Sequence, residues 1–194
     1  MTGKNRKDRQ DDLKDTGRIK DEAATDTVKV SRIYFDMDGV LADFDRGVTE
    51  LCGLEPLAQG ITGPREELMW GRIRDVGHFY GKLEPMPGAI ELFHALYEKY
   101  GDAVEILTGI PRPKRGITDA AEDKTEWVHR ILSEKVKVNV VIREHKPRYC
   151  TGKDCILIDD YEKNIREWEA AGGTGILNKN AQETLEKLKK MKIL

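Results

Sequence analysis

The chain has 194 residues, with 33 Lys and Arg against 35 Asp and Glu, a formal net charge of −2 and 39% hydrophobic residues. This length suits one domain with a small insertion. The balanced charge gives no electrostatic basis for binding a nucleic-acid polymer or an anionic membrane. No apolar stretch approaches the ~18 residues of a membrane-spanning helix, and the amino terminus is charged rather than signal-like. We therefore expect a soluble, cytoplasmic protein.

The first 28 residues mix Lys, Arg, Asp and Glu with almost no large apolar side chains. Such a segment cannot bury enough apolar surface to offset the entropy lost on ordering it. We expect residues 1–28 to form a disordered charged tail, in preference to a specific docking element, and assign it no part in the chemistry.

The rest of the chain alternates between short apolar runs and helical patterns. Strands are predicted at residues 30–35, 104–107, 136–142 and 155–158, with a weaker one at 175–177. Helical spacing is found at residues 88–100, 118–134, 161–171 and 181–191. Strands that alternate with helices indicate parallel βαβ units. The predicted fold class is α/β, a three-layer Rossmann-like parallel sheet with helices on both faces.

One segment breaks this alternation. Residues 44–82 contain helical pieces at 44–52 and 66–74 but no clear strand. We predict a small helical cap at 44–82, inserted after the first strand, with residues 29–43 and 83–194 forming the α/β core. The Pro-Met-Pro-Gly run at 85–88 marks the return to that core, because Pro and Gly commonly stand at element boundaries.

Polar side chains follow each of the first four predicted strands. In strand order they are Asp36 and Asp38, Thr108 and Gly109, Lys146, and the pair Asp159 and Asp160. Ligands of open parallel sheets bind outside the carboxyl ends of the strands, so we expect these groups to share one crevice.

Any one of these residues has an ordinary structural explanation. A lone Asp-x-Asp can cap a turn or a helix, and a lone Lys or Thr carries almost no signal. Together, however, four close acids would repel one another unless a cation lay among them, and Mg²⁺ prefers carboxylate oxygens. Lys146 and Thr108 beside such an ion suit the oxygens of a phosphoryl group, which backbone N–H groups near Gly109 could also approach.

The same residues resemble the motifs of the haloacid dehalogenase superfamily of phosphohydrolases, over roughly residues 30–178. Within that superfamily the sequence is most similar to the 5′(3′)-deoxyribonucleotidases. The similarity lies in D-M-D-G-V-L-A-D-F at 36–44 and L-E-P-M-P-G-A at 83–89. Lys124, in K-T-E-W-V, precedes Lys146 at a separation similar to that between the two phosphate-site lysines of the family.

The resemblance implies a role for each carboxylate. Asp36 would attack phosphorus and form an aspartyl-phosphate, and Asp38 would act as general acid and then general base. Mg²⁺ would be held by Asp36, the backbone carbonyl of Asp38 and Asp160, with Asp159 in support.

It also implies how the phosphoryl group is bound. Thr108 and Lys146 would contact its oxygens, and Lys146 would hold Asp36 in place. Lys124 would add a further phosphate contact, although a solvated lysine on a helix is the plain alternative.

Three departures from the family concern the substrate. Gly109 stands where the nucleotidases usually carry serine, and the cap is shorter. Phe44 and Trp70 match two aromatic positions of the base pocket, but Arg74 falls where a third would be. Phe44 and Trp70 could stack a base or simply form the core of the cap.

The leading hypothesis is a phosphomonoesterase for a small phosphorylated metabolite, with (deoxy)nucleoside monophosphates as first choice. A sugar or polyol phosphate is the alternative substrate, and a non-catalytic binding protein on the same scaffold is the alternative of another class. The sequence leaves the oligomeric state open, and a homodimer is compatible with it.

Overall fold

The computed structural model describes residues 28–194. Of the charged tail predicted at residues 1–28, all but Val28 lies outside the described residues. None of the helices in the described part is long and apolar enough to cross a membrane.

The described residues form one five-stranded parallel sheet in the order β3–β2–β1–β4–β5. Its strands are β1 (Arg32–Phe35), β2 (Val104–Ile110), β3 (Val138–Ile142), β4 (Cys155–Asp159) and β5 (Thr174–Leu177). The predicted α/β class with a parallel sheet is therefore confirmed. β2 is longer than predicted, because Thr108 and Gly109 continue the ladder opposite Val140 and Val141 of β3.

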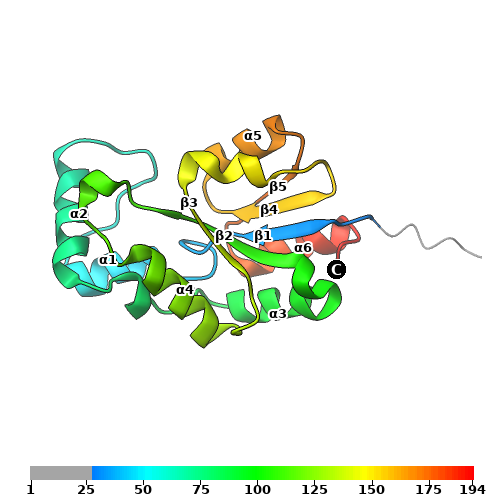
Figure 1. Cartoon of the computed structure of the whole chain (residues 1–194), viewed down its shortest axis with the longest axis horizontal. Coiled ribbons are helices and arrows are strands. Elements are labelled where there is room, and N and C mark those ends of the chain that lie inside the picture. Colours follow the sequence, from blue (N-terminus) through cyan, green and yellow to red (C-terminus); the bar gives the residue numbers. More distant parts are fainter. Residues whose placement is uncertain (1–27) are drawn as a thin grey trace, which may run out of the picture.

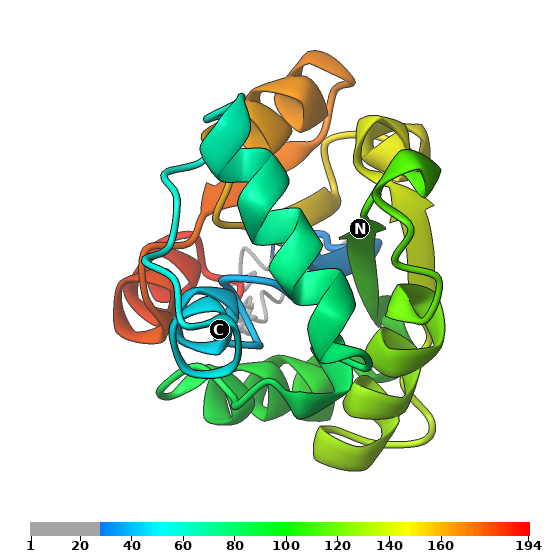
Figure 2. The same cartoon turned by 90° about the vertical axis from the view of Figure 1, so that its left-hand side faces the viewer.

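Helices cover both faces of the sheet (Figures 1 and 2). They are α3 (Ala89–Tyr100), α4 (Ala120–Ile131) and α6 (Ala181–Lys190) on one face and α5 (Glu162–Ala170) on the other. Side chains of β1 alternate between the two: Ile33 and Phe35 belong to the larger core, and Tyr34 to the smaller core under Trp168. This alternation fixes the register of the central strand.

Between β1 and α3 the chain forms α1 (Phe44–Cys52), α2 (Pro64–Val76) and the single turn η1 (Tyr80–Lys82). The Asp43 carboxylate caps α1 by accepting from Arg46 N–H, and Pro64 stands in the first turn of α2. Figure 1 shows α1 and α2 at the end of the molecule toward which the strands run. The division into core and cap stays a prediction.

Residues 77–83, here called the return segment, bring the chain from α2 back along α4. The Trp127 indole donates to the Leu83 carbonyl (2.7 Å), and Arg130 donates to the Gly81 carbonyl (2.7 Å). Trp127 is completely buried. The return segment is thus attached to α4 by hydrogen bonds one helical turn apart.

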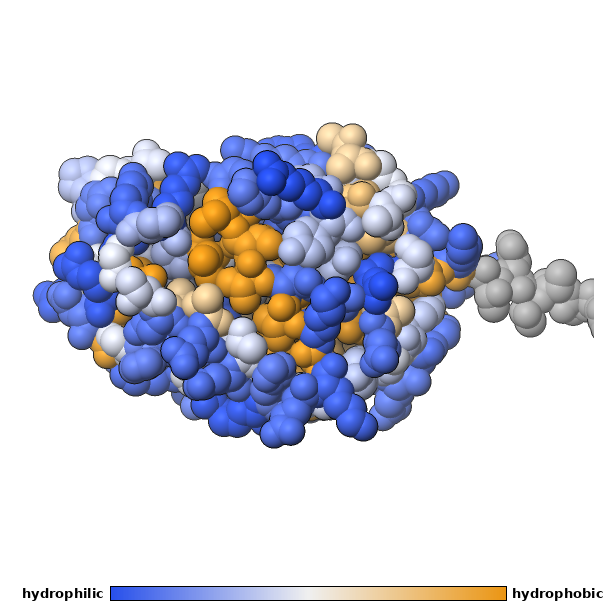
Figure 3. Space-filling view, viewed as in Figure 1, coloured by the Kyte–Doolittle hydropathy of each residue, from blue (hydrophilic) through white to orange (hydrophobic). Residues whose placement is uncertain are grey.

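Three further single-turn or short 3₁₀ helices complete the described chain: η2 (Gly101–Ala103), η3 (Pro113–Arg115) and η4 (Arg143–Tyr149). The edge strand β3 has mostly half-buried side chains. Figure 3 shows apolar side chains gathered in the middle of the face seen in Figure 1, within a largely polar surface.

Replacing Trp127 with alanine should lower the free energy of unfolding by about 3–5 kcal/mol, because the cavity and the unpaired Leu83 carbonyl both destabilise the fold. Urea denaturation of the two proteins measures this difference. Leu68→Ala is the control: Leu68 is 51% exposed on α2, so its loss should change stability by about 0.5 kcal/mol or less. Equal losses in the two variants would contradict this account of the core.

Candidate active site

A cavity of about 960 Å³ opens at the carboxyl edge of the sheet, between the core and residues 44–82. Of the residues predicted from the sequence, those that line it are Asp36, Asp38, Phe44, Trp70, Gly109, Lys146 and Asp160. Thr108, Lys124 and Asp159 are completely buried around it. Arg74 is the one predicted residue that lies apart.

Asp36 stands where β1 ends, and its position is fixed by the backbone. Its N–H donates to the Ile158 carbonyl of β4 (2.9 Å), so the residue still belongs to the sheet. Its Oδ1 accepts from Met37 N–H (2.8 Å) and lies 2.9 Å from Lys146 Nζ. The carboxylate is therefore oriented through one oxygen.

Lys146, from η4, links two carboxylates. Besides Asp36 it contacts Asp159, with Nζ 2.7 Å from Oδ2. Burial lowers the pKa of Lys146, but the Asp36 and Asp159 carboxylates outweigh this effect and the net pKa is raised. The amine therefore remains charged at neutral pH.

Lys124, from α4, is completely buried rather than solvated. Its Nζ donates to Asp38 Oδ2 (2.6 Å), Thr108 Oγ1 (2.9 Å) and the Gly109 carbonyl (2.9 Å). The same amine lies 4.4 Å from the centre of the Tyr80 ring. Three donated bonds use all the protons of the ammonium group, which fixes it against Asp38.

Asp38 uses only one of its carboxylate oxygens. Oδ2 accepts from Lys124, whereas the buried Oδ1 has no hydrogen-bond partner among the described residues. Burial raises the pKa of Asp38, Lys124 opposes the rise and Asp36 adds to it, with a net increase. Such a carboxyl can hold a proton on Oδ1.

Asp159 and Asp160 are adjacent but have different environments. Asp159 is saturated with donors: Asn164 Nδ2 contacts both oxygens (3.0 and 2.9 Å), Tyr161 N–H contacts Oδ1 (2.9 Å) and Lys146 contacts Oδ2. Asp160 is partly exposed and its Oδ2 accepts from Gln59 (2.6 Å). Burial, with the Asp36 and Asp159 charges, raises the pKa of Asp160 to about 8.

Gly39 explains why glycine follows the Asp-x-Asp. Its φ is +72°, a conformation that other residues rarely adopt. A Cβ at this position would lie 2.3 Å from Asp160 Oδ2. The glycine thus lets the ends of β1 and β4 bring their carboxylates together.

The donor set fits a divalent cation. One oxygen each of Asp36, Asp159 and Asp160 lie within 4.8 Å of one another. Three carboxylates this close repel one another, and this repulsion adds to the effect of burial in raising the pKa of Asp160. Hard cations take such oxygens as ligands.

Part of the cavity wall is aromatic, with Phe44, Trp70 and Tyr80 among the lining residues. The Phe44 ring is 6.4 Å from Trp70 and 5.5 Å from Phe79, and it also touches the Tyr80 ring. Phe44 and Trp70 are half-buried, so they both pack with the segment and line the cavity. The two interpretations of these aromatics are therefore compatible.

Arg74 does not lie in the pocket, contrary to the expectation from the sequence that it is a substrate-pocket residue. Its side chain is 54% exposed, pairs with Asp75 and does not line the cavity. Arg115 of η3 is the arginine beside the aromatics: it lies 5.6 Å from the centre of the Trp70 ring and donates to Glu66 (2.6 Å). A contact between distant segments, rather than spacing along α2, decides which arginine reaches the pocket.

Sequence reasoning also missed two polar residues that hold the acids. Asn164 stands in the first turn of α5, four residues after Asp160, and this position could have been noticed in the sequence. Gln59 lies in the loop between α1 and α2, and nothing in its local sequence marks it.

Comparison with known proteins identifies the family. A sequence model described as 5′ nucleotidase, deoxy (Pyrimidine), cytosolic type C protein matches residues 50–187. That span includes Thr108, Lys124 and Lys146 but begins after Asp36 and Asp38. A Vibrio phage KVP40 protein named "Putative 5'(3')-deoxyribonucleotidase" is 30% identical over 132 residues, covering 68% of this chain and 67% of its own.

Solved structures show the same fold. A haloacid dehalogenase-like hydrolase from Streptococcus pneumoniae matches with a TM-score of 0.55 at 13% identity, over 83% of this chain and 91% of its own. A haloacid dehalogenase-like hydrolase from Xanthomonas campestris matches with a TM-score of 0.57 at 14% identity, over 87% and 94%. With the fold and the sequence match in agreement, the chain belongs to the 5′-deoxynucleotidase family of haloacid dehalogenase-type phosphatases and is a phosphoric monoester hydrolase.

Proposed function

We propose that the protein is a Mg²⁺-dependent phosphomonoesterase that hydrolyses (deoxy)nucleoside monophosphates to nucleoside and phosphate through an aspartyl-phosphate on Asp36. One observation carries the proposal: each carboxylate of the Asp36–Asp38 pair has its own buried lysine. Lys146 contacts Asp36 and Lys124 contacts Asp38. The two carboxylates therefore have different charged neighbours, which suits them to different roles in the reaction.

In the first step Asp36 is the nucleophile. Its Oδ1 is held by Met37 N–H and Lys146, which leaves Oδ2 to attack phosphorus in line with the leaving oxygen. A bond forms between Oδ2 and phosphorus, and the bond from phosphorus to the nucleoside oxygen breaks. Asp38 donates the proton from Oδ1 to that oxygen, and the nucleoside leaves as an alcohol.

In the second step water hydrolyses the aspartyl-phosphate. Asp38, now ionised beside Lys124, accepts a proton from the water as its oxygen attacks phosphorus. The bond between phosphorus and Asp36 breaks, inorganic phosphate is released and both aspartates return to their starting states.

Mg²⁺ would be held by Asp36, Asp160 and the backbone carbonyl of Asp38, with Asp159 in support. When bound, Mg²⁺ would neutralise charge on the phosphoryl oxygens and on the carboxylates around them. Asp160 suits direct contact because it is partly exposed toward the cavity. Asp159 suits a supporting role because donors already occupy both of its oxygens.

The phosphoryl group has positive charge on two sides. Lys146 lines the cavity beside Asp36, and Lys124 lies behind Thr108 and Gly109. Thr108 accepts from Lys124, so its own hydroxyl proton is available to a phosphoryl oxygen. Lys146 and Thr108 would thus donate hydrogen bonds to the equatorial oxygens, and Lys124 would contribute positive charge without donating to them.

Three observations support a nucleotide as the substrate. The chain belongs to a nucleotidase family, and the phage relative carries a deoxyribonucleotidase name. The cavity of about 960 Å³ is large enough for a mononucleotide. Phe44 and Trp70 line it and can stack a base. The proposal places the enzyme in the cytoplasm, in keeping with a family described as cytosolic.

Asp36→Asn should lower phosphate release at least about 1,000-fold, because the amide cannot act as the nucleophile. Purified protein with Mg²⁺ is assayed against nucleoside monophosphates, sugar phosphates and an aryl phosphate, and nucleoside monophosphates should give the highest kcat/KM. Asp75→Asn, on the exposed end of α2, is the matched control and should retain activity. An active Asp36→Asn variant refutes the mechanism, whereas activity restricted to aryl and sugar phosphates refutes only the substrate.

Mg²⁺ binding should tighten about tenfold between pH 7 and pH 9. The pKa of Asp160 is about 8 without a cation, so the carboxyl is largely protonated at pH 7 and Mg²⁺ must displace that proton. Calorimetry in buffers of different ionisation enthalpy should detect nearly one proton released per ion at pH 7. Asp160→Asn should abolish both effects. An Mg²⁺ affinity that does not change with pH would show that the ion displaces no proton from Asp160.

Lys124→Met should lower kcat/KM about 100-fold or more, because it removes the cation that faces Asp38 and Thr108. The control is Lys135→Met, an exposed lysine just beyond α4, which should leave steady-state kinetics unchanged. Circular dichroism checks that both variants fold. Equal kinetics in the two folded variants would remove Lys124 from the site.

A further inference from the structure

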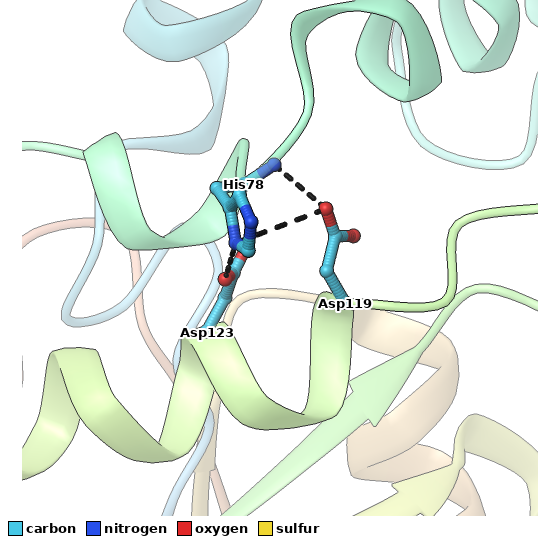
Figure 4. A group of neighbouring side chains, drawn as sticks. All are labelled: His78, Asp119 and Asp123. Carbon is cyan, nitrogen blue, oxygen red and sulfur yellow. Dashed lines mark hydrogen bonds and ion pairs between the residues drawn. The ribbon is translucent and has the colours of Figure 1, made fainter.

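A second group of metal-ligating side chains lies where the return segment meets α4. His78 comes from the return segment, Asp119 directly precedes α4, and Asp123 lies in its first turn (Figure 4). One ligand atom from each lies within 4.8 Å of the other two. The proposed phosphatase reaction uses none of these residues.

The geometry is built by both segments. Asp119 and Asp123 are four residues apart, which places them on one side of the helix. His78 has a φ of 49°, and its backbone N–H donates to Asp119 Oδ2 (2.7 Å). Its imidazole Nδ1 lies 2.8 Å from Asp123 Oδ1 and 4.0 Å from Asp119 Oδ2. Figure 4 shows the contacts that run from His78 to both carboxylates.

One carboxylate oxygen of the group is left without a partner. The Asp123 side chain is only 3% exposed, and its buried Oδ2 has no hydrogen-bond partner in residues 28–194. A buried anionic oxygen is costly unless a donor or a cation compensates it. The adjacent Lys82 is engaged elsewhere, since its Nζ donates to the carbonyls of Val76 and Gly77. Two carboxylates therefore face a single imidazole.

We propose that His78, Asp119 and Asp123 form a second divalent-cation site, selective for a borderline ion such as Zn²⁺ over Mg²⁺. One imidazole nitrogen and two carboxylate oxygens are a ligand set that Zn²⁺ accepts at distances of about 2.0–2.2 Å, which separates neighbouring ligand atoms by about 3–3.5 Å. The observed 2.8 and 4.0 Å bracket that separation. The imidazole ring also distinguishes this site from the all-oxygen group beside Asp36.

The exposure of the imidazole gives the ion access. His78 is 70% exposed, so water can complete the coordination. The Asp123 and Asp119 carboxylates raise the pKa of His78, and a cation on Nδ1 would compete with a proton there. The ion would then join the return segment to α4, one residue before Lys124.

The test uses the full chain, stripped of metal and kept in excess Mg²⁺ so that the carboxylate site near Asp36 is occupied. Zn²⁺ is titrated by calorimetry, and Co²⁺ is used as a spectroscopic probe of nitrogen and oxygen ligands. His78→Asn is the principal variant, because Asn tolerates a positive φ and keeps the N–H that contacts Asp119. Asp123→Asn tests the buried carboxylate, and Asp119→Asn replaces it if that variant does not fold.

Wild type should bind one Zn²⁺ per chain with Mg²⁺ present, and His78→Asn and the Asp variant should each weaken binding about tenfold or more. His94→Asn is the matched control, since His94 has no carboxylate within ion-pair distance among the described residues, and binding should be unchanged. Asp36→Asn should also retain the ion, so failure of the phosphatase proposal and failure of this one are distinguishable. Absence of Zn²⁺ binding in wild type, or equal affinity in His78→Asn, overturns the site.

Discussion

The structure depends on two lysines that lie among four carboxylates, which the pairing of β1 with β4 brings close together. Asp36 and Asp38 follow β1, and Asp159 and Asp160 stand at the end of β4, its hydrogen-bonded neighbour. Buried charges are tolerated only when they are paired and hydrogen-bonded. Lys146 pairs with Asp36 and Asp159, and Lys124 pairs with Asp38. Lys124 is completely buried and Lys146 almost completely. The surrounding elements serve to bring these two amines to the edge of the sheet.

The two lysines come from different elements, and they give the two carboxylates different hydrogen-bond partners. Lys146 is on η4, just after β3, and contacts the oriented oxygen of Asp36 together with Asp159. Lys124 is on α4 and contacts only one oxygen of Asp38, which leaves the other free for a proton. The two aspartates therefore have different surroundings, and burial raises the pKa of Asp38, as the proposed role of general acid requires.

α4 connects the buried Lys124 with the return segment. It carries Lys124 into the site, and it also holds the return segment through Trp127 and Arg130. The Tyr80 ring, from that segment, lies over the Lys124 amine and contacts Phe44 of the aromatic wall. The lysine side and the aromatic side of the cavity therefore share one packed network, so that residues 44–82 and the sheet edge shape the same cavity.

The sequence by itself determined the sheet, the helices and most of the acids, because side chains at the ends of parallel strands must meet at one edge. It could equally identify Lys146, Thr108 and the inserted segment. The tertiary structure decided the burial of Lys124, 86 residues from Asp38, the contact of Gln59 with Asp160, and the choice of Arg115 over Arg74 beside Trp70. These depend on how helices and loops pack over long distances along the chain. Local periodicity reports which face of an element is apolar, but not which distant residue will lie against it.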